Sequence, residues 1–338
     1  MAFDGLLGQN KLKDHTAMLI KNGRLSHAYI FSGPAGIGKK TFAREFAKEV
    51  ACVSPEDGRS CGRCKSCILA ASGNNTDIRM IASKDGKGPS VDTVRREICD
   101  DVAKAPLFSS RKIYVIENGD GMNDPAQNAL LKTLEEPPAY VMILILCDSV
   151  LPLLETIRSR SVIFELERYK DDEIVRAYED LKNRFAAEGK NFYEKDRELL
   201  VAYADGIIGR IEDICVSDTI NETRKSILRG LSCLFSGDPS ARIELGRIFD
   251  AKNKNYDFIF FSMTSILMDA MVLERCGPKA KIMNSDLKKE ITEMAANAGY
   301  YRIKNSLFLA DECYKNLKRN AAAELSVDNM LIGMEKRV

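Results

Sequence analysis

The first half of the chain alternates short apolar runs with segments in which apolar residues recur every three or four positions. The apolar runs predict strands over residues 27–32, 78–83, 112–116, 141–146 and 161–164. The helical spacing between them predicts helices over 39–50, 91–102 and 124–135. Because strand and helix alternate, we expect an α/β fold built on a doubly wound parallel sheet.

Two of these elements carry further signals. The run at 141–146 is apolar throughout, as a strand covered on both faces of a parallel sheet should be. The helix at 124–135 is expected to have Asp124 as its N-cap and Pro125 at its first helical position. Pro137 and Pro138 then end it.

The pattern changes after about residue 165. Strand-like runs largely disappear, and apolar residues recur at helical spacing through the rest of the chain. We therefore predict an α/β domain over 1–165, a small helical domain over 166–218 and an all-helical domain over 219–338. The stretch 258–268 is apolar almost all round, which predicts a helix buried in a core or against a partner.

Composition narrows the class of protein. A chain of 338 residues with 45% hydrophobic and 29% charged residues has the length and balance of a soluble protein with two or three domains. Its 50 basic and 49 acidic residues leave a net charge of +1, so no overall field favours nucleic acid or a membrane. No uninterrupted apolar run reaches membrane-spanning length, and the first residues lack the pattern of a secretory signal.

Four of the ten cysteines are clustered, and the other six are scattered, which fits a reducing cytoplasm better than a disulfide framework. The cluster is Cys52, Cys61, Cys64 and Cys67, spaced C-x8-C-x2-C-x2-C. Four thiolates complete the tetrahedral shell that zinc prefers and leave no open position for a substrate water, so we expect a structural zinc ion. The alternative is a set of buried or redox-active thiols.

A phosphate-binding loop lies between the first strand and the first helix of the α/β domain. It reads Gly33-Pro-Ala-Gly36-Ile-Gly38-Lys39. In such a loop the glycines let backbone N–H groups wrap the phosphates, and the lysine meets the terminal phosphate oxygens. The pattern makes ATP or ADP a candidate ligand; the alternative is an ordinary glycine-rich turn.

Two positions of this site depart from the pattern that hydrolysis requires. The residue after Lys39 should be Ser or Thr, whose hydroxyl binds Mg²⁺, but the chain has Lys40, with Thr41 one residue late. After the strand at 112–116 the chain has Glu117 and Asn118 where a metal-binding Asp and a basic Glu are expected. Glu117 has the length to reach a metal ion, but Asn118 cannot accept a proton, and loss of a general base slows a reaction by about 10²–10⁴. We expect poor hydrolysis and regard Mg²⁺ as a doubtful ligand.

Together, these residues resemble the clamp-loader branch of the AAA+ ATPases. The strings that carry the resemblance are 7–9, 25–34, the four-cysteine module at 52–67, the NALLKTLEEPP string at 128–138, and TIRSR at 156–160. They cover roughly residues 1–165. The resemblance implies an AAA+ domain with an inserted zinc module, then a helical lid over 166–218 and an oligomerisation collar over 219–338. These last two fit only by size and class.

That family contains ATP-hydrolysing motors, the gamma/tau subunits, and a largely inactive stator, delta-prime. Here Gly209 falls where motors carry a lid arginine that senses nucleotide, with Arg210 one residue along. Cys147 and Asp148 follow the strand at 141–146, where motors carry Thr. With Lys40 and Asn118, these departures resemble the stator.

A delta-prime-like chain implies a set of partners. It would join gamma/tau and delta subunits in a hetero-oligomeric ring within the DNA-directed DNA polymerase III holoenzyme. Through that complex it would help load the sliding clamp onto primed DNA in the cytoplasm, without a membrane and without an ATPase activity of its own.

The resemblance also gives Arg160 a role. In such rings an arginine of one subunit enters the nucleotide site of its neighbour, where a guanidinium stabilises the charge of the transition state. This effect is worth about 10³–10⁵ in rate in related systems. Arg160 would therefore be a catalytic residue acting in trans; the alternative is a solvated surface arginine.

Two rival functions stay open. The first is an active gamma/tau-like motor, in which Glu117 performs the carboxylate work and Thr41 serves Mg²⁺. The second is a stand-alone zinc-containing nucleotide-binding protein outside replication. ATP turnover that depends on Lys39 would favour the first, and failure to co-purify with clamp-loader subunits would favour the second.

Overall fold

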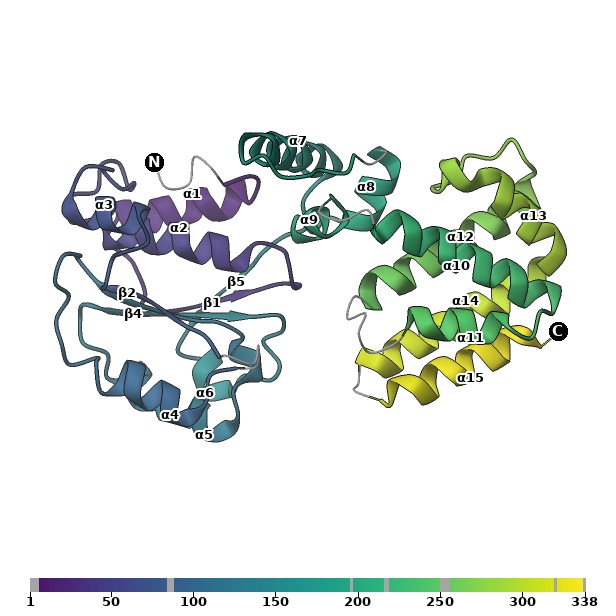
Figure 1. Cartoon of the computed structure of the whole chain (residues 1–338). Helices are drawn as coiled ribbons and strands as arrows, with labels where there is room; N and C mark the ends of the chain where they lie inside the picture. Colours follow the sequence, from purple (N-terminus) through teal and green to yellow (C-terminus); the bar gives the residue numbers. More distant parts are fainter. Residues whose placement is uncertain are drawn as a thin grey trace. The chain divides into compact units, whose positions relative to one another are not determined.

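The computed structural model describes residues 6–83, 88–194, 197–215, 219–249, 256–318 and 321–336. The chain forms two compact units (Figure 1). The first comprises residues 1–181 and 204–211, and the second comprises residues 182–203 and 212–338. The finer division into an α/β domain, a lid and a collar stays a prediction.

The first unit is built on a five-stranded parallel sheet, which confirms the predicted fold class. Its strands are β1 (Ala28–Ser32), β2 (Ile78–Ile81), β3 (Lys112–Ile116), β4 (Val141–Cys147) and β5 (Val162–Glu165). The order across the sheet is β2-β3-β4-β1-β5. Because β4 lies between β1 and β3, the loops that leave these three strands meet at one edge of the sheet. Every residue of β4 is buried, as its unbroken apolar run predicts.

Helices cover both faces of the sheet (Figure 1). On one side lie α1 (Asn10–Lys21), α2 (Lys39–Ala51) and the short α3 (Lys65–Ala71). On the other side lie α4 (Val91–Val94), α5 (Asp124–Glu135) and α6 (Glu155–Arg158). Aromatic rings of β1, α2 and β5 pack on the first face, with Phe31 5.3 Å from Phe42 and 5.8 Å from Phe164 between ring centroids. Such pairs add to the hydrophobic burial that holds α2 on the sheet.

Two local predictions on this second side need correction. The N-cap of α5 is Asn123, whose side-chain oxygen accepts a hydrogen bond from the Ala126 N–H at 3.0 Å; Asp124 is already helical. Both residues are good N-caps, so the sequence alone could not choose between them. The helix expected over 91–102 is α4 followed by a π-helical turn, Arg95–Cys99.

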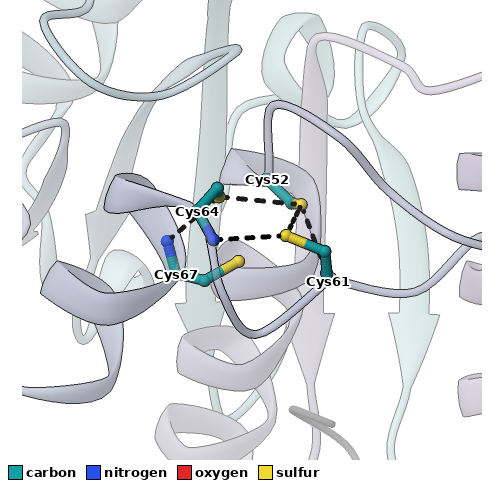
Figure 2. Close-up of side chains that lie close together, drawn as sticks. All are labelled: Cys52, Cys61, Cys64 and Cys67. Atoms are coloured by element: carbon teal, nitrogen blue, oxygen red, sulfur yellow. Dashed lines mark hydrogen bonds between the residues drawn. The ribbon is translucent and has the colours of Figure 1, made fainter.

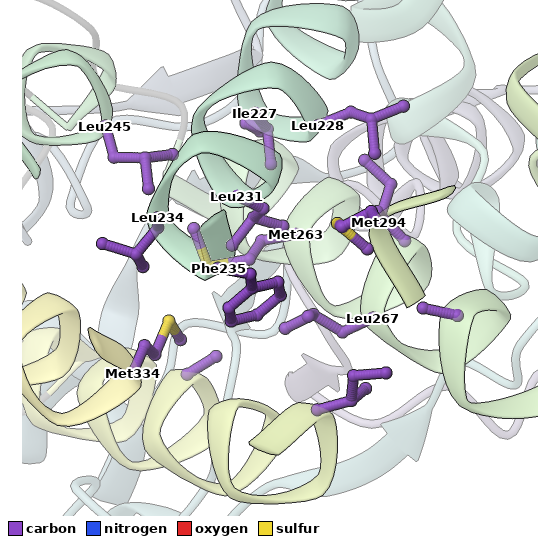
Figure 3. Close-up of a cluster of buried hydrophobic side chains, with 14 of the residues drawn as sticks. Ile227, Leu228, Leu231, Leu234, Phe235, Leu245, Met263, Leu267, Met294 and Met334 are labelled. Carbon is purple, nitrogen blue, oxygen red and sulfur yellow. The ribbon is translucent and has the colours of Figure 1, made fainter. Parts of the chain in front are cut away.

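The described residues after β5 form helices joined by turns and irregular segments, with no strand. The helices are α7 (Asp171–Ala187), α8 (Arg197–Ala204), α9 (Gly209–Cys215), α10 (Thr219–Ser236), α11 (Ala241–Ile248), α12 (Tyr256–Cys276), α13 (Lys288–Ala298), α14 (Tyr300–Lys318) and α15 (Ala323–Glu335). Figure 3 shows the core of the second unit, where Leu231 and Phe235 of α10 lie near Met263 and Leu267 of α12. The all-helical character predicted for this half is confirmed.

Helix α12 contains the apolar stretch 258–268 and is buried as predicted. By length and composition alone it could cross a membrane, although the uninterrupted runs within it are shorter. However, 61% of its most apolar window is buried inside the structure, as in the core helices of soluble proteins. Its hydrophobicity is therefore explained by the core of the second unit.

Candidate functional site

The phosphate loop has the backbone that its glycines predict. It leaves β1 at Ser32 and enters α2 at Lys39, with Gly38 as the helix N-cap. Gly36 and Gly38 have φ angles of 81° and 101°, a region that residues with a side chain rarely adopt. The predicted loop is therefore present between strand and helix, with the N–H groups of the first turn of α2 at its end.

Lys39 is already engaged by groups of the protein. Its Nζ donates to the carbonyl oxygens of Gly33 at 2.6 Å and of Pro34 at 3.1 Å. It also forms an ion pair with Asp148 at 2.6 Å. Asp148 follows β4, so the strand order brings it opposite a loop more than a hundred residues earlier. A phosphate that binds Lys39 must compete with this carboxylate.

Lys40 occupies the place where a Mg²⁺-binding hydroxyl is expected. Its ammonium lies 2.6 Å and 2.8 Å from the two carboxylate oxygens of Glu117, which follows β3. The Glu117 side chain is 18% exposed and that of Lys40 is 47% exposed, so water partly screens the pair. Lys40 and Glu117, two of the residues that depart from the ATPase pattern, thus neutralise each other. Thr41 lies one residue along on the exposed side of α2.

The end of β4 carries no reactive thiol. Burial, reinforced by the nearby Asp120 carboxylate, raises the pKa of Cys147 to about 12. Asp120 also accepts a hydrogen bond from the Asp148 N–H at 2.9 Å. The sequence analysis named Asp148 only as part of an altered sensor position and gave Asp120 no role, so the contacts of both aspartates were missed.

Gly209 is packed against the phosphate loop. Its N–H donates to the Gly36 carbonyl at 2.9 Å, and a Cβ added to it would lie 2.8 Å from the Gly36 Cα. There is no room for a side chain at this position without movement of the backbone. The neighbouring Arg210 lies 3.8 Å from a carboxylate oxygen of Asp205. Gly209 therefore packs closely against the phosphate loop at the position where the resemblance places the sensor arginine of motor subunits.

The four cysteines of the C-x8-C-x2-C-x2-C pattern converge (Figure 2). Their sulfur atoms all lie within 4.8 Å of one another, with Cys52 3.6 Å from Cys61 and 4.0 Å from Cys64. A tetrahedral zinc site with Zn–S distances of about 2.3 Å has sulfur–sulfur edges of about 3.8 Å. The donor set and its spacing therefore fit zinc.

Backbone donors prepare this cluster for a metal ion. The N–H groups of Cys61, Cys64 and Cys67 each donate to the sulfur of the preceding cysteine at 3.4 Å. Burial opposes ionisation of Cys64, but hydrogen bonds from backbone groups outweigh it and lower its pKa to about 6. For Cys67, burial and the neighbouring Cys64 raise the pKa. The thiolate is the metal-binding form, so metal binding would displace the remaining protons.

Buried polar contacts attach the cysteine module to the α/β unit. The Glu49 carboxylate on α2 accepts a hydrogen bond from the Ser60 N–H. The Ser66 hydroxyl donates to the Ala51 carbonyl at 2.9 Å and lies 2.9 Å from the Ser109 hydroxyl. The module is therefore tied to the helix that begins at the phosphate loop.

Arg160 lies just beyond α6 and is partly exposed. One guanidinium nitrogen donates to the Thr156 carbonyl at 3.1 Å, and another lies 3.0 Å from a carboxylate oxygen of Glu135. The sequence analysis gave Glu135 no role of its own and did not predict this pairing. The only signal was that both residues fall in strings typical of clamp-loader proteins.

Comparison with known proteins shows what the first half of this chain is similar to. The family model described as "DNA polymerase III, delta subunit" matches residues 8–170. DNA polymerase III subunit tau/gamma of Haemophilus influenzae is 36% identical over 172 residues, 51% of this chain and 25% of that protein. DNA polymerase III subunit delta' of Pseudomonas aeruginosa is 38% identical over 138 residues, 40% of this chain and 42% of that protein. Residues 8–170 thus belong to the clamp-loader family of DNA polymerase III.

The chain spans less than half the length of each of these relatives. The family match at 8–170 contains the phosphate loop, the four cysteines and Arg160. A gamma subunit-related structure from Thermotoga maritima covers 98% of this chain and 99% of that chain, at 17% identity and a TM-score of 0.46. That superposition is too loose to bear on function. Both tau/gamma and delta' proteins are among the relatives, so the matches do not choose between motor and stator.

Proposed function

We propose that this chain is a delta-prime-like stator subunit of the bacterial DNA polymerase III clamp loader. In this proposal it joins gamma/tau and delta subunits in a cytoplasmic ring that loads the sliding clamp onto primed DNA. Membership of the clamp-loader family supports the assembly. The choice of stator over motor is supported by the charges at the nucleotide site.

The ion pair between Lys40 and Glu117 is the observation that carries the proposal. A motor holds Mg²⁺ between a hydroxyl and a carboxylate at these positions. Here the Lys40 ammonium neutralises the carboxylate and repels a divalent cation. Asn118 supplies no base to activate water, which by itself lowers a rate by about 10²–10⁴. The site therefore favours nucleotide binding without Mg²⁺, if ATP or ADP displaces Asp148 from Lys39, and disfavours hydrolysis.

The other predicted groups take supporting roles in the proposal. Cys52, Cys61, Cys64 and Cys67 hold a structural zinc ion, which stabilises the module and takes no part in chemistry. Arg160 acts in trans, as an arginine finger that completes the nucleotide site of a neighbouring gamma/tau subunit. Its exposure and its place at the end of α6 support this role.

The test is steady-state ATP hydrolysis by the purified chain alone, with Lys39→Ala as control and phosphate release as readout. We expect both proteins to show the same background rate, with zinc retained and the fold intact by circular dichroism. Turnover that disappears in Lys39→Ala would show a motor and overturn the stator proposal.

The active motor is the second candidate function because one observation favours it. The matched tau/gamma protein is similar over 172 residues, a longer stretch than the 138 residues shared with the delta' protein. In that case Glu117 would bind Mg²⁺ and Thr41 would supply the hydroxyl, which requires Lys40 to leave the carboxylate. The hydrolysis assay separates these functions. Co-purification of this chain with gamma/tau and delta subunits would exclude the third function, a stand-alone nucleotide-binding protein.

A further inference from the structure

Arg160 is held from two sides. Its guanidinium contacts the Thr156 carbonyl on its own helix and the carboxylate of Glu135 at the end of α5. A guanidinium has five N–H donors. Among the described residues, the other donors of Arg160 have no partner. This arrangement restricts the direction of the side chain and leaves donors available for another ligand.

The position of Glu135 is unfavourable for helix stability. It is the last residue of α5, where the helix dipole places partial negative charge and acidic side chains are disfavoured. The pair with Arg160 does not compensate through burial, because the side chains are 51% and 36% exposed. Exposed ion pairs contribute little to folding stability. An effect on the orientation of Arg160 explains the pair better than an effect on the fold.

Helix α5 also positions the segment that leads to Arg160. The Gln127 side chain is buried, donates to the Pro152 carbonyl at 3.1 Å and accepts from the Leu154 N–H at 2.8 Å. Leu154 immediately precedes α6. One end of α5 therefore holds the start of α6, and its other end, at Glu135, holds the arginine that follows α6.

We propose that Glu135 is a positioning residue for Arg160. Resting on the proposed function, the inference is that the Glu135 carboxylate keeps the guanidinium extended, so that it enters the neighbouring nucleotide site already oriented. Ordering a long flexible side chain before the reaction lowers the entropy that is lost in the transition state. Glu135 touches neither nucleotide nor reacting atoms and acts only through Arg160.

The experiment measures single-turnover ATP hydrolysis by the clamp-loader complex reconstituted from this full chain with gamma/tau and delta subunits. Glu135→Ala should lower the rate constant of the affected phase about tenfold with unchanged KM for ATP, since the loss lies in the transition state. Glu135→Gln keeps an acceptor oxygen without the charge, and its rate constant should lie between those of wild type and Glu135→Ala. The unfolding midpoint of the chain and the assembly of the complex should not change.

Glu136→Ala is the matched control, because Glu136 is an exposed carboxylate next in the chain with no ion pair among the described residues. A double variant tests whether Glu135 acts only through Arg160. In an Arg160→Ala background, Glu135→Ala should have no further effect on the rate constant. An added loss there, or an equal loss in Glu136→Ala, would overturn the positioning role.

Arg160→Ala distinguishes the failure of this inference from the failure of the proposed function. If Arg160→Ala lowers the rate but Glu135→Ala leaves it unchanged or raises it, Arg160 keeps its proposed role as an arginine finger and Glu135 does not position it. If Arg160→Ala has no effect in an assembled complex, the arginine-finger role itself fails, and the inference about Glu135 fails with it.

Discussion

At the scale of single residues, the nucleotide site is a set of paired charges. Lys39 pairs with Asp148, and Lys40 pairs with Glu117. The first pair joins the phosphate loop to the residue after β4, and the second joins it to the residue after β3. The loop keeps the backbone of a phosphate site, but its ammonium groups already have counter-ions, and one of them stands where Mg²⁺ would bind.

Replacing Lys40 with Thr tests this charge arrangement. The variant removes the ammonium, frees Glu117 and restores a hydroxyl that can bind Mg²⁺. We expect the affinity for ADP to rise at least about tenfold in the presence of Mg²⁺, corresponding to about 1.4 kcal/mol, and to change little without it. Titration of a fluorescent ADP analogue measures this, with Thr41→Ala as control. If the affinity of Lys40→Thr for ADP is the same with and without Mg²⁺, Glu117 does not reach the metal position.

A third ion pair, which unlike the first two is buried on both sides, stabilises the sheet. The Asp101 carboxylate lies 2.6 Å from the Lys112 ammonium and accepts a hydrogen bond from the Tyr114 hydroxyl at 3.0 Å. Both members of the ion pair are about 5% exposed. Burial alone would raise the pKa of Asp101, but the hydrogen bonds from Lys112 and Tyr114 outweigh it and hold the pKa below 3.8. The pair therefore stabilises the fold at neutral pH.

Asp101→Asn should lower the free energy of unfolding at pH 7 by about 3–5 kcal/mol, because it leaves a buried ammonium without a counter-ion. A carboxylate whose pKa is lower in the folded chain contributes stability above its unfolded pKa and loses it as the pH falls through the folded value. The difference from wild type should thus persist at pH 5 and shrink below about pH 4. Urea unfolding across this range measures it, and exposed Asp100→Asn should have little effect at any pH.

At the scale of secondary-structure elements, one arginine joins the ends of two helices. Arg302 of α14 donates to the carbonyls of Leu234 and Phe235 near the end of α10. It also donates to those of Met334 and Glu335 at the end of α15. The last carbonyls of a helix lack partners within it, so the buried guanidinium supplies donors at this point, although the Leu234 carbonyl also accepts from the Gly237 N–H at 3.3 Å.

Arg302→Met should destabilise the second unit by about 3 kcal/mol or more. Methionine fills similar space but cannot donate, which removes the donors that Arg302 gives to the buried carbonyls of Phe235 and Met334. Lys304→Met removes an exposed charge from the same helix and should have almost no effect. Thermal or urea unfolding compares the two variants. Equal stability of Arg302→Met and wild type would show that water replaces the guanidinium without loss.

At the scale of the whole molecule, the chain separates into two units with separate cores. The cysteine module belongs to the first unit and is attached through α2 and the segment before β3. The core of the second unit is made by helices α10–α15. Loss of a metal ion at the cysteines should therefore have a local effect.

Zinc chelation should remove hydrogen-exchange protection from residues 52–75 and leave the amides of α10–α15 protected. A structural zinc ion supplies much of the folding free energy of a small module, whereas the helical core does not depend on it. Metal analysis should give one zinc per chain, and Cys64→Ser should reduce it while reproducing the local loss of protection. Simultaneous loss of protection in both units would contradict this separation.

The sequence alone determined the features that depend on neighbours along the chain. The strands, the phosphate loop and the metal-ligand spacing were predictable, because periodicity, glycine conformations and chelation by short loops are local properties. Even where the N-cap of α5 was misplaced, the error was one residue. The apolar stretch in α12 likewise predicted a buried helix.

Only the tertiary structure decided which charged groups meet. Asp148 faces Lys39 because β4 lies beside β1, and Glu135 faces Arg160 because α5 packs against α6. The glycine at 209 is explained only by the backbone of Gly36 lying against it. Ion pairs and close packing depend on distances of a few ångströms between distant segments. Those distances follow from strand order and helix packing, which no local pattern contains.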